Sequence, residues 1–367
     1  MPKSRRGHRF FLFVAAVIAA VVVLGFNVGF QTNPGASPGS LVVHFIDVDQ
    51  GDSTLIQAEG VTILIDAGRH DRNDVVPYLR SVGVTSIDLL VGTHPHADHI
   101  GQFPQVLRAF PVKEVWLSGD ETTTRIFENT LDAILASKAG YHEPRAGERH
   151  ELGPLTIEVV HPDRVYGHLN NGSIGLRITY GDVVFLFTGD AEGDAERQMI
   201  ARGHNLQADV LHVGHHGSNT SSTLPFLQAV RPKIAVYSAG RNNSYGHPHR
   251  EVIDRLTQLK IPVYGTDVHG TILLETDGRS FWVKAGTDAP PLGAPVAPSG
   301  CRPGQVDVNS APAQELVKIV QIGNALAQEV IKRRPYASLD DLIRVPGIGD
   351  ARLRAIKDQG LACAGGL

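Results

Sequence analysis

The stretch of sequence that decides the fold is Thr93-His94-Pro95-His96-Ala97-Asp98-His99. It follows Ile87-Asp88-Leu89-Leu90-Val91-Gly92, a largely apolar run that predicts a buried strand. Three histidines and an aspartate offer imidazole and carboxylate groups, the donors that Zn²⁺ and Mn²⁺ accept. On a loop that leaves a strand, these side chains can reach one point if they turn inward together. The stretch therefore predicts a metal site at the end of a strand.

Two further strand ends supply candidate ligands. An apolar run at residues 183–187 ends in Thr188-Gly189-Asp190, and another at residues 210–213 ends in Gly214-His215-His216-Gly217-Ser218. Asp190 and one of the two histidines join the first loop if the three strands end at the same edge. Three ligand-bearing strand ends predict a site for two cations.

Strand-like and helical patterns alternate along residues 41–285. Two similar halves of this kind predict sheets flanked by helices. Period-2 alternation or short apolar runs predict the strands, and a 3.6-residue period predicts the helices. The predicted strands cover residues 41–47, 53–57, 61–66, 87–92, 114–118, 155–160, 176–180, 183–187, 210–213, 233–238, 271–275 and 280–284, and the predicted helices cover 74–82, 125–137, 192–202, 224–230 and 250–259.

The order of the motifs resembles the metallo-β-lactamase superfamily, and more narrowly the soluble hydrolase domain of the ComEC competence proteins. The resemblance covers residues 41–284 and implies an α/β fold, an αββα sandwich with metals at one edge between the sheets. Besides the stretches already quoted, it rests on Asp47-Val48-Asp49-Gln50-Gly51-Asp52-Ser53, Leu64-Ile65-Asp66-Ala67-Gly68, Asn170-Asn171-Gly172-Ser173 and Tyr245-Gly246-His247-Pro248.

The resemblance also implies a set of metal ligands. His94 and His96 are expected on one divalent cation, and Asp98 and His99 on the other. Asp190 is expected to bridge the two cations, which are Zn²⁺ or Mn²⁺.

One histidine of the 215/216 pair is expected to complete the second metal site. We assign His215 to the metal and His216 to catalysis, together with Asp98, Asp190 and His247. His216 or His247 is expected to contact phosphate or to protonate the leaving oxygen. His247 is also compatible with a simple turn between glycine and proline.

Other polar residues of the motifs are expected to support the ligands or to contact phosphate. Asp66 is expected to orient loop amides rather than to bind metal. Asp47 and Asp52 are equally compatible with a role as turn-formers. The full set is Asp47, Gln50, Asp52, Asp66, Asn171 and Ser173.

Two positions depart from the family pattern. Asn170-Asn171 stands where the superfamily often has a histidine. An amide oxygen is a weak ligand, so we expect a loosely held first cation, which favours Mn²⁺; His161 or His168 is an alternative third ligand. Asp49 stands where glycine is usual, and aspartate tolerates a left-handed turn better than most residues.

Residues 303–367 form a second unit after a Pro/Gly-rich linker at residues 286–302. Two glycine hairpins between short helical patterns resemble the paired helix-hairpin-helix domain of ComEA-type DNA receptors, a small all-α domain. Such hairpins bind phosphate through helix N-termini, so DNA binding should be independent of sequence and sensitive to salt. A helical interaction module without DNA affinity is the alternative. The expected DNA contacts are Gly323, Gly347, Ile348, Gly349, Arg352 and Arg354.

The N-terminal segment and the two cysteines indicate where the protein is located in the cell. Residues 1–30 join a basic start to an apolar run, which predicts a signal anchor, or a cleaved signal peptide, followed by a linker at residues 31–40. The expected location is the extracellular or periplasmic face. In an exported chain, Cys301 and Cys363 suggest a disulfide, although two free thiols are the alternative.

The distribution of charge indicates different roles for the two parts of the chain. The chain has a net charge of −4, whereas residues 301–367 carry nine Lys and Arg against seven Asp and Glu. The acidic remainder is a poor polyanion binder by itself. If the substrate is nucleic acid, the C-terminal region must help to hold it.

Together these features lead us to expect an exported metal-dependent phosphodiesterase that cuts DNA. Water acidified by two cations would attack phosphorus in line with the leaving oxygen. The resemblance implies a role in DNA uptake or extracellular DNA turnover, with DNA, the membrane and other competence proteins as partners. The alternatives are an esterase for small or cell-surface phosphodiesters and a non-catalytic DNA receptor.

Overall fold

The structure is a computed structural model that describes residues 39–287, 291–292, 301, 304–336 and 338–365. The expected membrane segment at residues 1–30 lies outside the described residues, as do most of the two predicted linkers. Among the residues described, no helix combines the length and the apolar character of a membrane span.

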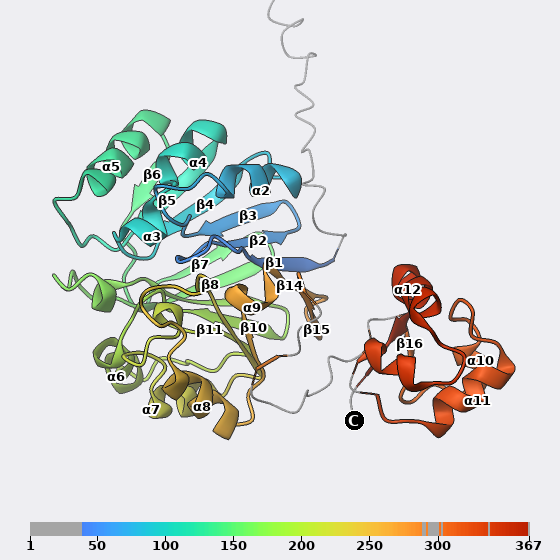
Figure 1. Cartoon of the computed structure of the whole chain (residues 1–367). Coiled ribbons are helices and arrows are strands. Elements are labelled where there is room, and N and C mark those ends of the chain that lie inside the picture. The colour runs from blue at the N-terminus through green and yellow to red at the C-terminus, as the bar shows by residue number, and fades with distance from the viewer. Residues whose placement is uncertain (1–38, 288–290, 293–300, 302–303, 337, 366–367) are drawn as a thin grey trace, which may run out of the picture. The chain divides into compact units, whose positions relative to one another are not determined.

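Two sheets form the inner layers of the domain at residues 41–285 (Figure 1). The first has eight strands in the order β15-β14-β1-β2-β3-β4-β5-β6. Their bounds are β1 Leu41–Phe45, β2 Thr54–Ala58, β3 Val61–Ile65, β4 Ile87–Gly92, β5 Val112–Leu117, β6 Gly140–His142, β14 Ile272–Thr276 and β15 Phe281–Ala285.

The second sheet has seven strands in the order β13-β12-β11-β10-β9-β8-β7. Leu292, beyond the main domain, adds a single bridge to Val263 of β13. The strand bounds are β7 Arg149–Leu152, β8 Leu155–His161, β9 Gly175–Tyr180, β10 Val183–Phe187, β11 Val210–His212, β12 Ile234–Tyr237 and β13 Val263–Gly265.

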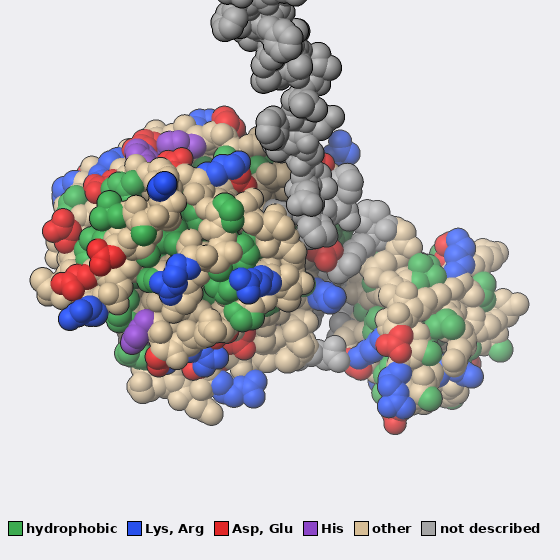
Figure 2. Space-filling view, turned by 90° about the horizontal axis from the view of Figure 1, so that it is seen from above, with side chains coloured by type: hydrophobic (Ala, Val, Ile, Leu, Met, Phe, Trp, Pro, Cys, Tyr) green, Lys and Arg blue, Asp and Glu red, His purple; other side chains and the backbone are tan. Residues whose placement is uncertain are grey.

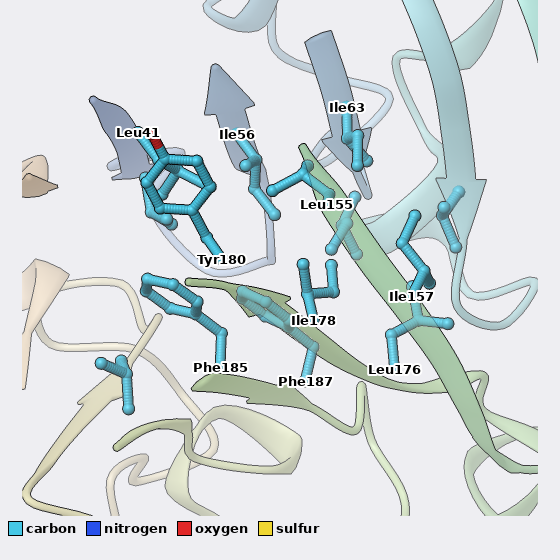
Figure 3. Close-up of a cluster of buried hydrophobic side chains, with 14 of the residues drawn as sticks. Leu41, Ile56, Ile63, Leu155, Ile157, Leu176, Ile178, Tyr180, Phe185 and Phe187 are labelled. Atoms are coloured by element: carbon cyan, nitrogen blue, oxygen red, sulfur yellow. The ribbon is translucent and has the colours of Figure 1, made fainter. Parts of the chain in front are cut away.

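The inner faces of the sheets meet in one apolar core (Figure 3). Ile56 and Ile63 from the first sheet face Ile157 and Ile178 from the second, and all four are at most 1% exposed. β-Branched and aromatic side chains suit this layer because they pack well on a pleated surface. The core therefore explains why the apolar runs of the sequence become strands.

Helices cover the outer face of each sheet, which confirms the predicted αββα sandwich (Figure 1). Helix α5 begins where the Thr124 hydroxyl accepts a hydrogen bond from the amide of Phe127, a side-chain cap. The outer surface over the first sheet mixes acidic and basic side chains (Figure 2). The helix bounds are α2 Val75–Ser81, α3 Ala97–Ile100, α4 Phe103–Ala109 and α5 Arg125–Ser137 on the first sheet, and α6 Gly193–Ala201, α7 Leu224–Val230, α8 Arg250–Gln258 and α9 Thr266–His269 in the second half.

Parallel pairing brings the ligand-bearing loops together. β4 runs parallel to β3 and β5, and β10 runs parallel to β11. Between the sheets, the amide of Ile174, just before β9, donates to the carbonyl oxygen of Thr93 (2.9 Å). Within the second sheet, the amide of Asp190 donates to the Ser173 hydroxyl (3.1 Å), and the amide of His215 donates to the carbonyl oxygen of Gly189 (3.1 Å). The segment before β9 therefore joins the loop after β4 to the loops after β10 and β11.

The C-terminal domain has its own core, which includes Leu316, Val330, Leu342 and Ile356. Ser338 and Asp341 form a capping box. In addition to the expected helices, a short parallel strand pair closes the domain. The elements are β16 Val306–Asp307, α10 Ala313–Leu316, α11 Asn324–Lys332, the 3-10 helix η3 Leu339–Arg344, α12 Asp350–Gln359 and β17 Ala362–Cys363.

Cys301 and Cys363 form a disulfide, as predicted, with their Cα atoms 5.7 Å apart. The bond ties β17 to the segment that enters the domain. A domain of this size has a small core, so a covalent link of this kind contributes much of its stability.

Candidate metal centre

Two groups of metal-ligating side chains share Asp190. One consists of His94, His96 and Asp190, and the other of Asp52, His99, Asp190 and His216. Within each group, one nitrogen or oxygen atom of every residue lies within 4.8 Å of the others. All of these side chains are buried except His96, which is half-buried. The groups come from loops on both sheets.

Free ligand atoms in the second group point toward a common position. The nitrogen His99 Nε2 lies 3.3 Å from Asp190 Oδ1, and His216 Nε2 lies 3.8 Å from Asp190 Oδ2. Three buried atoms, His99 Nε2, His216 Nε2 and Asp190 Oδ1, have no hydrogen-bond partner. Buried polar atoms without a partner are costly, and a divalent cation would satisfy all of them. The donor set therefore fits a metal.

In the first group, the two histidines lie within hydrogen-bond distance of each other. His94 Nε2 lies 2.8 Å from His96 Nδ1 and 3.5 Å from Asp190 Oδ2. Asp190 is held in turn by the Ser173 hydroxyl, which accepts a hydrogen bond from the Asp190 amide at 3.1 Å. Ser173 was predicted to support the ligands, and its contact with Asp190 is of that kind.

Hydrogen bonds at the far side of each imidazole select the nitrogen that faces the centre. His99 Nδ1 donates to Asp66 Oδ2 at 2.8 Å, and His216 Nδ1 donates to the carbonyl oxygen of Ser238 at 3.0 Å. Asp66 also accepts from the amide and the hydroxyl of Thr93. Both bonds leave Nε2 free as a ligand atom. Asp66 thus links His99 to the start of the loop at Thr93.

The pKa values of the buried histidines show that the cluster favours positive charge. Burial lowers the pKa of His99 and of His216, but Asp190 outweighs it, with help from Asp66 for His99 and from Asp52 for His216. Both pKa values therefore stand well above the usual range. Without a cation, the two imidazoles supply the positive charge that the carboxylates require.

Both histidines of the 215/216 pair lie close to Asp190. His216, expected to act in catalysis, lies in the four-residue group, and His215, expected as a ligand, lies just outside it. His215 Nε2 is 3.6 Å from Asp190 Oδ2, and its Nδ1 is 3.2 Å from the Thr220 hydroxyl. Both histidines have positive φ, 52° and 55°, so the turn does not alternate its side chains as a strand does.

Two acidic residues flank the second group. Asp98, expected as a ligand, has its Oδ2 3.3 Å from His216 Nε2. Asp52, expected behind the ligands, lies within the second group, and its oxygens are 3.5 Å from His216 Nδ1 and 3.9 Å from His99 Nδ1. Asp49 adopts a φ of 63°, the left-handed turn that the motif requires there. That turn places Asp52 next to the centre.

The remaining predicted residues hold the surrounding loops. Gln50 Oε1 accepts from the amide of Gly240 at 3.1 Å, and Asn171 Oδ1 accepts from the amide of Glu192 at 3.1 Å. Asp47 caps its own turn through the amide of Asp49. His161 and His168, considered as extra ligands, instead contact the backbone of Asn171.

A cavity of about 320 Å³ opens onto the centre. His247 and Tyr245 lie on its wall, with rings stacked at 5.7 Å and an interplanar angle of 18°. Burial and the nearby His216 lower the pKa of His247 to about 4. Tyr245 is 66% exposed, an unusual position for a large ring. The sequence motif contained Tyr245, but no pattern gave it a role.

Comparison with known families decides the classification. Residues 46–241 match the model of the metallo-beta-lactamase superfamily. The chain belongs to this superfamily. In addition, residues 303–359 match the helix-hairpin-helix motif. Both parts of the predicted resemblance are thereby confirmed.

Curated relatives of this metallo-beta-lactamase chain include competence proteins. ComE operon protein 3 of Bacillus subtilis is 32% identical over 250 residues, which are 63% of this chain and 32% of that protein. Competence protein ComA of Neisseria gonorrhoeae is 31% identical over 258 residues, which are 69% of this chain and 35% of that protein. The chain thus spans about a third of the length of these relatives. Among solved structures, the metallo-hydrolase Igni18 of Ignicoccus hospitalis has a TM-score of 0.45 and 18% identity, over 63% of this chain and 98% of that one.

The helix-hairpin-helix domain repeats one geometry twice. Gly323 begins α11 and Gly349 begins α12, and in both cases the space where a Cβ would stand is open. Two residues before each glycine, the backbone is left-handed, with a φ of 60° at Gln321 and 97° at Gly347. Arg352 joins the two hairpins by donating to Gln321 Oε1 at 3.3 Å and to the Gly347 carbonyl oxygen at 2.6 Å. The N-termini of α11 and α12 are therefore uncovered at these two glycines.

Proposed function

We propose that this protein is an exported, metal-dependent phosphodiesterase that cuts DNA, with a role in DNA uptake or in turnover of extracellular DNA. The observation that carries the proposal is the pair of buried ligand groups that share Asp190. Two cations held in this way would acidify water and neutralise the charge on a phosphoryl group. Either Mn²⁺ or Zn²⁺ suits the imidazole and carboxylate donors.

The side chains around the centre would place the scissile phosphate. Asp190 and the imidazoles of His94, His96, His99 and His216 would hold the cations. His247, on the cavity wall, is within the same ring cluster as His215 and His216, and it would contact phosphate oxygens. Tyr245 offers an exposed ring to a nucleobase at the cavity mouth.

The helix-hairpin-helix domain would supply DNA affinity that the acidic hydrolase domain lacks. The amides at the starts of α11 and α12 suit phosphate groups, because a helix N-terminus carries partial positive charge. The disulfide supports the proposal of export, since such bonds persist in oxidising compartments. A membrane anchor and association with other competence proteins complete the proposal.

One assay separates the three functions considered. The purified protein with Mn²⁺ or Zn²⁺ is given single-stranded DNA, double-stranded DNA and bis(p-nitrophenyl) phosphate. The proposed nuclease cuts DNA and loses this activity in the His96→Ala variant, which still binds DNA. Activity confined to the small ester indicates an esterase, and DNA binding without hydrolysis under either metal indicates a receptor.

The exposed guanidinium of Arg354 tests the DNA contact. We expect Arg354→Ala to weaken DNA binding about equally for all sequences and to reduce the slope of log K against log salt by about 0.9, because one phosphate contact is lost. Fluorescence anisotropy at several salt concentrations measures both quantities. Arg250→Ala, on α8 of the hydrolase domain, is the matched control. An unchanged slope in Arg354→Ala removes this residue from the interface.

Tyr245 tests whether a base stacks at the cavity mouth. We expect Tyr245→Ala to raise KM for DNA about tenfold, because stacking of one base on an aromatic ring contributes about 1–3 kcal/mol. Tyr245→Phe keeps the ring and should behave like the parent protein. The two variants should hydrolyse bis(p-nitrophenyl) phosphate at equal rates. An equal loss on DNA for Ala and Phe would contradict stacking and point to the hydroxyl.

A further inference from the structure

The last strands of the two sheets follow each other in the chain. β6 is the edge of the first sheet, and β7 is the edge of the second. Residues 143–148 cross from one to the other. The crossing segment is flanked by His142, at the end of β6, and His150, within β7. Glu148 lies just before β7.

These three side chains converge on one point. His142 Nε2 lies 2.7 Å from Glu148 Oε2, and His150 Nε2 lies 3.1 Å from the same oxygen. One donor atom of each residue is within 4.8 Å of the other two. The side chains are 31–37% exposed, so a cation from solvent can reach them.

The surroundings hold the three groups in place. The amide of Arg145 donates to Glu148 Oε1 at 2.7 Å, which fixes the carboxylate and leaves Oε2 toward the imidazoles. The ring of Trp116, which is buried, lies 4.7 Å from the ring of His150 and 5.7 Å from that of His142. An apolar floor under polar ligands excludes water from one side of such a site.

We propose that His142, Glu148 and His150 form a third divalent-cation site, separate from the metal centre and suited to a transition metal such as Zn²⁺. Two histidines and one glutamate are a known zinc ligand set, and three protein ligands leave a position for water. Because β6 and β7 belong to different sheets, a cation bound by residues of both strands would link the two sheets at this edge. Binding to the folded state alone would raise the thermal midpoint as the Zn²⁺ concentration increases.

Trp116 provides a reporter for this site. The chain has two tryptophans, so Trp282→Phe leaves Trp116 alone. Ni²⁺ and Co²⁺ quench a nearby indole, and we expect saturable quenching of Trp116 that Zn²⁺ prevents by competition. In the same background, His142→Gln/His150→Gln should lose the quenching. His70→Gln, which removes an exposed histidine elsewhere, and Asp190→Asn, which changes the metal centre, should both retain it.

Metal content and stability give independent readouts. After equilibrium dialysis against Zn²⁺, the double variant should hold one equivalent less than His70→Gln, measured by mass spectrometry of the metal. Its Zn²⁺-dependent rise in thermal midpoint should be smaller by several degrees, since a cation that binds only the folded state raises that midpoint. Equal metal content together with unchanged quenching would overturn the proposal. Should the double variant misfold, Glu148→Gln decides. The glutamine keeps an oxygen that can accept from the amide of Arg145. The proposal requires this variant to weaken Ni²⁺ affinity, measured by quenching of Trp116, at least about tenfold.

Discussion

Replacing Asp190 with asparagine is expected to lower kcat for phosphodiester hydrolysis by at least about three orders of magnitude, equivalent to about 4 kcal/mol of barrier. Asp190 is the one residue that the two ligand groups share, and its carboxylate oxygens lie 3.3 Å from His99 Nε2 and 3.5 Å from His94 Nε2. Asparagine has the same shape but lacks the charge. Both cations should therefore bind more weakly, which dialysis and metal analysis measure.

A matched variant separates this effect from general damage. Asp132→Asn removes an exposed acidic side chain on α5 and should keep metal content and activity. DNA binding by Asp190→Asn should equal that of the parent protein, since the helix-hairpin-helix domain is unchanged. If Asp190→Asn retained more than about a tenth of the parent activity, the shared carboxylate would not be the basis of catalysis.

Removal of the disulfide is the change expected to affect stability most. The bond joins residues separated by 62 positions. In the chain-entropy treatment, opening a loop of that length costs about 4 kcal/mol, an upper value. We expect Cys301→Ser/Cys363→Ser to lose DNA binding on mild heating, because its small C-terminal core cannot offset that cost. Anisotropy against temperature measures the midpoint.

Hydrolysis of a small phosphodiester provides the internal control for the disulfide. The metallo-beta-lactamase domain contains neither cysteine, so its activity on bis(p-nitrophenyl) phosphate should persist in the double variant over the same temperature range. Reduction of the parent protein with dithiothreitol should reproduce the loss of DNA binding. Identical binding midpoints for the oxidised protein and the double variant would contradict a stabilising role.

Much of the fold could be predicted because its strands are buried on both faces. β10 reads as a continuous apolar run and β4 as an apolar run interrupted only by Asp88, and such runs need a sheet with cover on each side. The edge strands β6 and β7 could not be predicted in this way. β6 and β7 contain polar residues at most positions, Gly-Tyr-His and Arg-His-Glu-Leu, because they lie at the rims of the sheets. The proposed third cation site lies on these two strands.

The candidate metal centre was predictable in its loops but not in its individual atoms. His94, His96, His99 and Asp190 follow strands whose ends meet, so their convergence follows from sheet topology. The choice between His215 and His216 depends on a turn with two positive φ angles, which no periodicity reveals. Asp52 resembled a turn-former because its contacts with His99 and His216 come from distant parts of the chain.

Diffraction from crystals grown with Mn²⁺, collected at a wavelength where manganese scatters anomalously, tests the central claim most directly. The account predicts two anomalous peaks on either side of Asp190, one next to His94 and His96 and the other next to His99 and His216. A single peak at Asp190, or peaks bound to other residues while Asp190 contacts none, would contradict a centre built from two cations and a shared carboxylate.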